Sequence, residues 1–130
     1  MNKKDTLRLK EITGKISKNK KVVAIFLFGS QVTGKAREDS DIDIAVLIKD
    51  PSEKDESFIA QFWDDKLDIH SFHRLPLEIQ FRVLRDGKIL FIRNNKYVKY
   101  VWLKVIKSYL DFGPFISNFY RRVIQNAWFW

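Results

Sequence analysis

The chain has 130 residues and a formal net charge of +8 at neutral pH. A chain of this length buries about two thirds of its unfolded surface, so one domain can fold without disulfides or a structural metal. It contains no cysteine, which excludes disulfide bonds and thiol catalysis and fits a reducing cytoplasm. The apolar run Val22–Phe28 is too short to cross a bilayer, and residues 1–10 do not resemble a signal peptide. We therefore expect a cytoplasmic protein with no membrane contact.

Positive charge is concentrated in the last third of the chain. Residues 1–87 contain sixteen Lys and Arg against fifteen Asp and Glu, whereas residues 88–130 contain eight against one. A basic segment of this kind indicates an acidic partner surface, a nucleic acid or a solvated face. We expect a core of residues 1–93 and a helical extension of residues 94–130 within the same compact domain.

Predicted helices and strands alternate along the first 93 residues. Hydrophobic spacing and capping signals predict helices over residues 5–17, around residues 56–63 and over residues 76–85. Strands are predicted over residues 22–28, 41–48, 66–72 and 88–92. This order predicts an α/β (α+β) fold in which a small mixed sheet of about four strands is flanked by helices.

Two carboxylates lie on one face of the second predicted strand. Side chains two apart on a strand point the same way, so Asp41 and Asp43 project together. The opposite face carries four apolar residues, Ile42, Ile44, Val46 and Ile48. Two carboxylates about 4 Å apart repel by roughly 4 kcal/mol near a protein surface, so one is protonated or a cation lies between them. A hard divalent ion, Mg²⁺ first, suits these oxygen ligands.

A glycine and a serine follow the first predicted strand. Gly29 allows a tight turn and close approach of a ligand, and Ser30 offers a hydroxyl and a backbone N–H at the predicted start of a helix. An anionic group such as a phosphate is expected there. Residues 31–40 would then return the chain to the acidic pair, so that phosphate site and metal ligands meet at the ends of adjacent strands. Ser30 as a helix N-cap is an alternative compatible with this role.

The pattern Gly29-Ser30, ten residues, then Asp41-Ile42-Asp43 resembles the signature of the polymerase-β-like nucleotidyltransferase superfamily. A chain this short is most similar to the minimal nucleotidyltransferases of that superfamily, and the resemblance covers roughly residues 7–92. It implies the superfamily's fold, a serine that contacts the triphosphate of ATP, and paired aspartates that hold two Mg²⁺ ions.

The resemblance also implies a third acidic residue on a later strand. Asp68 lies at the matching position, while Asp64 and Asp65 remain alternatives. In the implied reaction, Gly29 and Ser30 bind the nucleotide, and Asp68 shares the second metal ion with the aspartate pair. That ion would activate an acceptor hydroxyl for attack on the α-phosphorus. Asp68 could also take the hydroxyl proton.

The resemblance points to a protein as acceptor. Minimal nucleotidyltransferases are often encoded with HEPN-type toxins, which cleave RNA, and act as antitoxins that transfer AMP to a toxin tyrosine. We therefore expect a hetero-oligomer with a HEPN-type toxin. Three alternatives stay open: neutralisation by binding alone, transfer to a small molecule, and transfer to RNA. Steep salt dependence would mark direct nucleic-acid binding, which we rank lower.

The two histidines are expected to have structural or surface roles, because no cysteine accompanies them in a zinc-site spacing. His70 shares a strand face with Asp68, however. A position near the acidic site is therefore a second hypothesis for His70, while His73 points elsewhere.

The last third of the chain predicts two amphipathic helices. Residues 98–109 have apolar side chains at helical spacing and should cover the sheet. The segment Asp111-Phe112-Gly113-Pro114 is expected to break the chain. Residues 115–130 then form a second helix that ends in Trp128-Phe129-Trp130. Aromatic residues beside Arg121 and Arg122 are typical of protein contact surfaces, so we expect a partner interface or a homodimer there rather than a membrane-surface helix.

Overall fold

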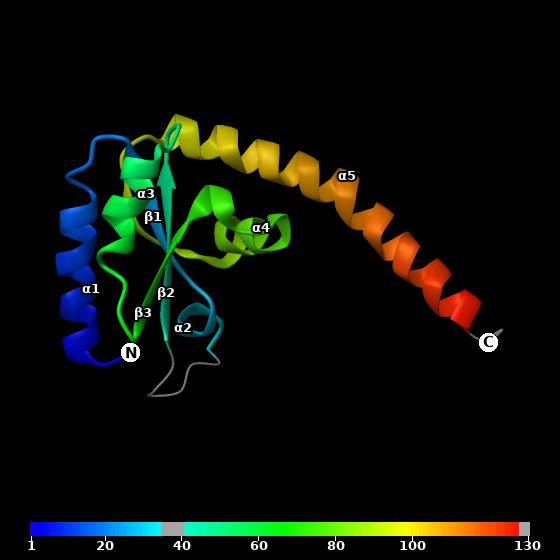
Figure 1. The fold of residues 1–130 in the computed structure, drawn as a ribbon, viewed down its shortest axis with the longest axis horizontal. Coiled ribbons are helices and arrows are strands. Elements are labelled where there is room, and N and C mark those ends of the chain that lie inside the picture. Colours follow the sequence, from blue (N-terminus) through cyan, green and yellow to red (C-terminus); the bar gives the residue numbers. More distant parts are fainter. Residues whose placement is uncertain (35–40, 128–130) are drawn as a thin grey trace.

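A four-stranded sheet lies between two layers of helices in the computed structural model, which describes residues 1–34 and 41–127 (Figure 1). The elements are α1 (Lys3–Ile16), β1 (Val22–Phe28), α2 (Ser30–Thr33), β2 (Ile42–Ile48), α3 (Glu53–Ala60), β3 (Leu67–Ser71), the 3₁₀ helix η1 (Phe72–Arg74), α4 (Leu77–Asp86), β4 (Lys88–Ile92) and α5 (Asn95–Ala127). Helices α1 and α3 cover one face of the sheet, and α4 and α5 cover the other (Figure 1). The predicted fold class is confirmed.

The strand order is β3-β2-β1-β4. β1 is antiparallel to both β2 and β4, while β2 and β3 are parallel. A parallel pair needs a crossover connection, which α3 supplies between β2 and β3. The sheet is therefore mixed, as predicted. The start of β2, the start of β3 and the end of β1 lie together at one edge of the sheet, where the strands begin or end.

Both faces of the central strands are buried, which explains their nearly continuous apolar sequence. On one face, the four apolar residues of β2 pack with α1 and α3; the cluster includes Leu9, Ile12, Ile16, Ile42, Ile44, Val46, Ile48 and Ile59. On the other face, α4 and α5 complete a second cluster that includes Phe26, Ala45, Leu47, Phe72, Val83, Val101 and Val105. Asp43 alternates along β2 with the four apolar residues that face α1 and α3. Its side chain is therefore on the opposite face, which α4 and α5 cover.

The predicted break between two C-terminal helices is wrong, because α5 is one helix of 33 residues that runs through Pro114. A proline inside a helix removes one hydrogen bond and crowds the preceding turn. A proline can either kink or end a helix, and here the segments on both sides have helical spacing, so the helix continues. Figure 1 shows the second half of α5 leading away from the sheet.

The first half of α5 is held by buried side chains and by aromatic contacts with α4. Val101 and Val105 are buried, and the ring of Tyr109 stacks on Phe81 with centroids 4.1 Å apart. The prediction that residues 98–109 cover the sheet is confirmed. Further along, the exposed fractions of Leu110 and Phe112 are 62% and 55%.

The predicted interface in residues 115–130 is not tested by these contacts, and Trp128-Phe129-Trp130 lies outside the described residues. None of the helices within residues 1–34 and 41–127 has both the length and the hydropathy needed to cross a membrane.

Candidate active site

Strand pairing brings two of the predicted carboxylates together. In the parallel β2–β3 pair, Asp43 lies opposite Asp68, and in the antiparallel β1–β2 pair Phe28 lies opposite Asp43. Side chains that are directly opposite in a sheet point to the same face. Three neighbouring strands therefore contribute Phe28, Asp43 and Asp68 to one row across the sheet.

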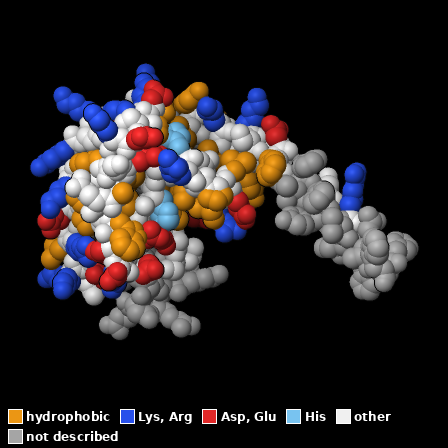
Figure 2. All heavy atoms as spheres, in the orientation of Figure 1, with side chains coloured by type: hydrophobic (Ala, Val, Ile, Leu, Met, Phe, Trp, Pro, Cys, Tyr) orange, Lys and Arg blue, Asp and Glu red, His pale blue; other side chains and the backbone are white. Residues whose placement is uncertain are grey.

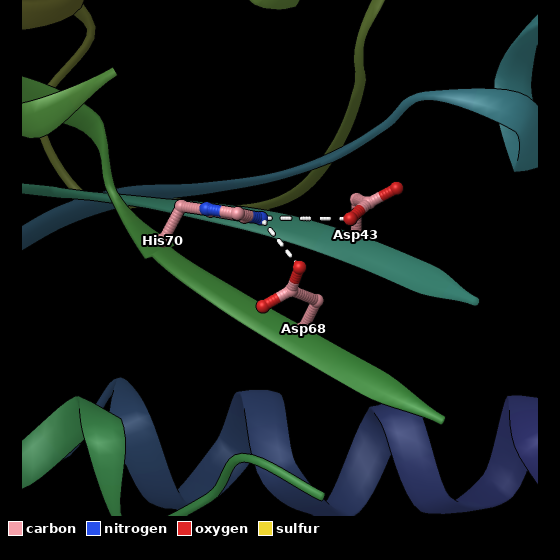
Figure 3. Close-up of side chains that lie close together, drawn as sticks. All are labelled: Asp43, Asp68 and His70. Atoms are coloured by element: carbon pink, nitrogen blue, oxygen red, sulfur yellow. Dashed lines mark hydrogen bonds and ion pairs between the residues drawn. The ribbon is translucent and has the colours of Figure 1, made fainter. Parts of the chain in front are cut away.

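A histidine completes this group. Ligand atoms of Asp43, Asp68 and His70 all lie within 4.8 Å of one another. His70 Nε2 is 3.2 Å from Asp68 Oδ2 and 3.5 Å from Asp43 Oδ1, and Figure 3 shows the imidazole directed between the two carboxylates. The hypothesis that His70 lies near the acidic site is confirmed. His73 instead has a structural contact, with its Nε2 2.9 Å from the carbonyl oxygen of Ile48.

The carboxylates raise the pKa of His70. The hydrogen bond with Asp43 raises the pKa of the imidazole, and the charge of Asp68 raises it further, while partial burial opposes both effects. The edge of the imidazole also packs against the Phe28 ring, with centroids 5.5 Å apart. The raised pKa means that the two carboxylates favour the protonated, positively charged form of the imidazole.

Gly29 lets the end of β1 lie against this group. Its backbone has φ 77° and ψ −149°, a region that side-chain-bearing residues almost never adopt. A Cβ added at Gly29 would lie 2.7 Å from Asp43 Oδ2. Ser30 is the first residue of α2, as predicted, and the N–H groups of Val32 and Thr33 donate to the Gly29 carbonyl. The sharp turn thus places the backbone of Gly29, the residue before Ser30, against Asp43.

Asp41 differs from the other predicted ligands. It is exposed and lies one residue before β2, and its carboxylate does not belong to the group formed by Asp43, Asp68 and His70. Its backbone carbonyl accepts a hydrogen bond of 3.4 Å from the Gln31 side chain, which ties the start of β2 to α2. The role of Asp41 as a metal ligand stays a prediction.

Asp64 has a structural role rather than the role of third carboxylate. Its Oδ1 accepts hydrogen bonds from the backbone N–H groups of Lys66 and Leu67 at 2.8 and 2.9 Å, and its Oδ2 pairs with Arg8. These contacts fix the start of β3. Asp68 is therefore the carboxylate that β3 places beside Asp43.

A cavity of about 180 Å³ adjoins the turn after β1. Its lining comes from β1, α2 and α4 and comprises Phe28, Gly29, Val32, Thr33, Ile79, Arg82, Asp86 and Gly87. Sequence reasoning missed the α4 wall, because nothing in the local pattern of residues 77–86 indicates which strand end that helix covers. The cavity offers room for part of a ligand beside Gly29, while the role of Ser30 in binding a phosphate stays a prediction.

The chain matches the family model described as polymerase beta, nucleotidyltransferase, over residues 10–96. No curated protein matches it. The similar solved structures include a toxin-antitoxin with AMP-PNP, at 24% identity and TM-score 0.70, covering 88% of this chain and 98% of that one. A second is a tri-AMPylated Shewanella oneidensis HEPN toxin in complex with an MNT antitoxin, at 21% identity and TM-score 0.64, covering 88% and 95%. A third, the toxin-antitoxin MntA-HepT, has 21% identity and TM-score 0.64 and covers 88% and 96%.

The similar solved structures share the fold of this chain. Since the family match extends over more than half of the residues, this chain belongs to the polymerase beta nucleotidyltransferase family.

Proposed function

We propose that this protein transfers a nucleotide from ATP to a hydroxyl group in a reaction that depends on Mg²⁺. The single observation that carries the proposal is the convergence of Asp43 and Asp68 beside the turn at Gly29. Two carboxylates from adjacent strands, next to a backbone turn that a phosphate can approach, fit the needs of a nucleoside triphosphate and its metal ions.

The donor set fits hard divalent ions. Asp43 and Asp68 offer carboxylate oxygens, and His70 is near enough to both to act as their counter-charge when no cation is bound. Asp41, one residue before β2, would be the further carboxylate of this site. When bound, two Mg²⁺ ions would neutralise the phosphates and lower the pKa of the acceptor hydroxyl.

The protein's own groups orient the reactants. The Ser30 hydroxyl and backbone N–H bind the β- and γ-phosphates, which approach closely because Gly29 has no side chain. Asp68, the more exposed of the two carboxylates, receives the proton of the attacking hydroxyl. The bond to the α-phosphorus then forms as the bond to pyrophosphate breaks.

For the acceptor, we propose a tyrosine hydroxyl of a HEPN-type toxin, so that the protein acts as a cytoplasmic antitoxin by adding AMP. The proposal is supported by similar solved structures that are toxin-antitoxin complexes, one with AMP-PNP and one with a tri-AMPylated HEPN toxin. The exposed apolar side chains of α5, among them Leu103, Leu110 and Phe112, suit a hetero-oligomer. A homodimer through α5 would use the same surface.

A test is to incubate the protein with Mg²⁺ and α-labelled ATP, alone and with proteins captured from its native host, followed by intact-mass measurement. Asp43→Asn and Asp68→Asn should each lower the rate of AMP transfer at least about 100-fold, the loss typical of one transition-state electrostatic contact. Asp65→Asn makes the same change in charge near the site, on an exposed residue outside the carboxylate group. It should keep the activity.

Occlusion of the partner is a second candidate function, because the exposed apolar side chains of α5 could block a partner without any chemistry. Stable capture of a toxin with no nucleotide transferred, and unchanged neutralisation by Asp43→Asn, would favour occlusion and overturn the enzymatic proposal. Transfer of AMP to the captured protein that is lost in Asp43→Asn would exclude it.

A further inference from the structure

We propose that the edge of the sheet opposite the active site, together with the first turns of α5, binds single-stranded nucleic acid. β1 and β2 are antiparallel, so the start of β1, the end of β2 and the end of β4 meet at this opposite edge. β2 has seven residues, which separates the two edges by roughly 20 Å. The surface is thus distinct from the carboxylate site.

A cavity of about 650 Å³ lies at this edge. Its lining contains five basic side chains and one acidic one and comprises Lys20, Lys21, Val23, Lys49, Asp50, Arg93, Asn94, Asn95 and Lys96. A hollow of this volume accommodates one or two nucleotides. Figure 2 shows Lys and Arg side chains along the side of the molecule where α5 begins.

Four of the five basic side chains of this cavity fall into two groups. Lys21 and Arg93 build its walls: Lys21 Nζ lies 2.5 Å from Asp55 Oδ2, and Arg93 donates to the Ser17 carbonyl. Within residues 1–34 and 41–127, no ion pair involves Lys20 or Lys96. These two ammonium groups can therefore face a ligand's phosphates.

The beginning of α5 adds a second favourable element for anions. The Asn94 side chain accepts a hydrogen bond of 3.1 Å from the Tyr97 N–H, so the helix starts at the cavity wall. The free N–H groups and the dipole of a helix favour negative charge at its N-terminus. The helix N-terminus adds to the attraction for anions, but the inference rests on the basic cavity.

Aromatic rings alternate with cations along the same turns. Lys49 Nζ lies 5.7 Å from the centre of the Tyr97 ring, and Lys104 Nζ lies 5.4 Å from that of Tyr100. The two tyrosine rings are 6.1 Å apart, and Tyr100 is 54% exposed. Both tyrosines and Lys104 also line a second hollow of about 200 Å³.

The Lys49–Tyr97 contact links the two hollows, because Lys49 lines the first and Tyr97 lines the second. Single strands bind to surfaces of this kind, in which cations follow the phosphates and rings stack on successive bases. An acidic protein would also match the cations, but the placement of one cation beside each of two neighbouring rings is the pattern that a single strand uses. Nucleic acid is therefore the better fit.

The experiment measures fluorescence anisotropy of labelled 12-nucleotide single strands, oligo(U) RNA and oligo(dT) DNA, across a series of salt concentrations. The unmodified protein should bind, with an affinity that falls steeply as salt rises. Lys20→Glu/Lys96→Glu should weaken binding at least tenfold and reduce the salt dependence. Tyr100→Ala should weaken it by about 5- to 150-fold, the loss typical of one stacked base.

The control is Lys4→Glu/Lys10→Glu, which makes the same change in charge on exposed positions of α1, behind the other face of the sheet. Its affinity should change less than threefold, and thermal unfolding should be similar for all variants. Equal losses in both double variants, or no binding by the unmodified protein, would overturn the proposal. The proposal would also be overturned if polyglutamate competed as well as RNA and Tyr100→Ala had no effect. That result would indicate an acidic protein partner. AMP transfer should be unchanged in Lys20→Glu/Lys96→Glu, so the two proposals can fail separately.

Discussion

At Gly29 the shape of the backbone and the position of a carboxylate depend on each other. The positive φ of this residue turns the chain away from the direction of β1. Because Gly29 has no side chain, Asp43 Oδ2 can occupy the space where a Cβ would lie. Gly34 has the same φ of 77°, but none of the residues that the structure describes lies within 4 Å of a Cβ added there. A substitution at Gly34 therefore tests backbone strain alone, whereas a substitution at Gly29 adds a steric clash with Asp43.

We expect Gly29→Ala to abolish AMP transfer and to lower the free energy of unfolding by about 1–3 kcal/mol, because both strain and collision act there. Gly34→Ala should show a smaller loss of stability, from strain alone, and keep most of the activity. Urea unfolding and a single-turnover transfer assay measure the two effects. Equal activity of the two variants would mean that the approach of Gly29 to Asp43 has no role.

At the scale of the elements, one carboxylate ties α3 to the segment before β1. The Ser52 hydroxyl accepts from the Asp55 N–H, and Asp55 accepts from the Ser52 N–H, so together they form the capping box of α3. Asp55 also receives the Lys21 ammonium at 2.5 Å and the Asn19 amide at 3.0 Å. The Lys21 hydrogen bond is the main reason that the pKa of Asp55 is held well below its usual 3.8.

A carboxyl group whose pKa is lowered by folding stabilises the protein above its unfolded pKa and loses this effect as pH falls through the folded value. Asp55→Asn should therefore lower the urea midpoint at pH 7, and the difference from the unmodified protein should shrink below about pH 4. Unfolding measured from pH 7 to pH 2 checks this. The exposed Asp65→Asn variant is the control, and a constant difference across the range would contradict the prediction.

At the scale of the whole molecule, α5 extends beyond its described ring contacts with α4. The described ring contacts between α5 and α4 reach Tyr109, while the helix continues to Ala127. A helix without tertiary contacts is marginal in water, so a partner or a second copy would stabilise this segment. The exposed Leu110 and Phe112 begin the surface that such a partner would cover.

Deletion of residues 115–130 should leave the thermal unfolding temperature within about 2 °C, because surface segments contribute little to stability. The same deletion should remove partner binding or change the oligomeric state, as measured by light scattering and by capture of the partner. A shortened protein with the same oligomeric state, solubility and partner binding would show that this end of the chain is not an interface.

Several features were predictable because they depend on residues close in sequence. A period of two places Asp43 opposite the isoleucines of β2, and the apolar run before Gly29 ends in a turn that a glycine permits. Helix spacing likewise indicates α1 and the first half of α5. These patterns are local, so the sequence determined the strands, the helices before α5, the mixed α/β class and the family signature.

The rest required the folded chain. Asp68 and His70 reach Asp43 only because the α3 crossover sets β3 parallel to β2 in one register, and a shift of one residue would turn both side chains to the other face. The basic cavity beside α5 joins residues from three strand ends, and no local pattern encodes that meeting. Pro114 shows the same limit: a local signal for a break is outweighed when the flanking turns continue one helix. Local spacing determined which residues could act, and long-range pairing decided which of them meet.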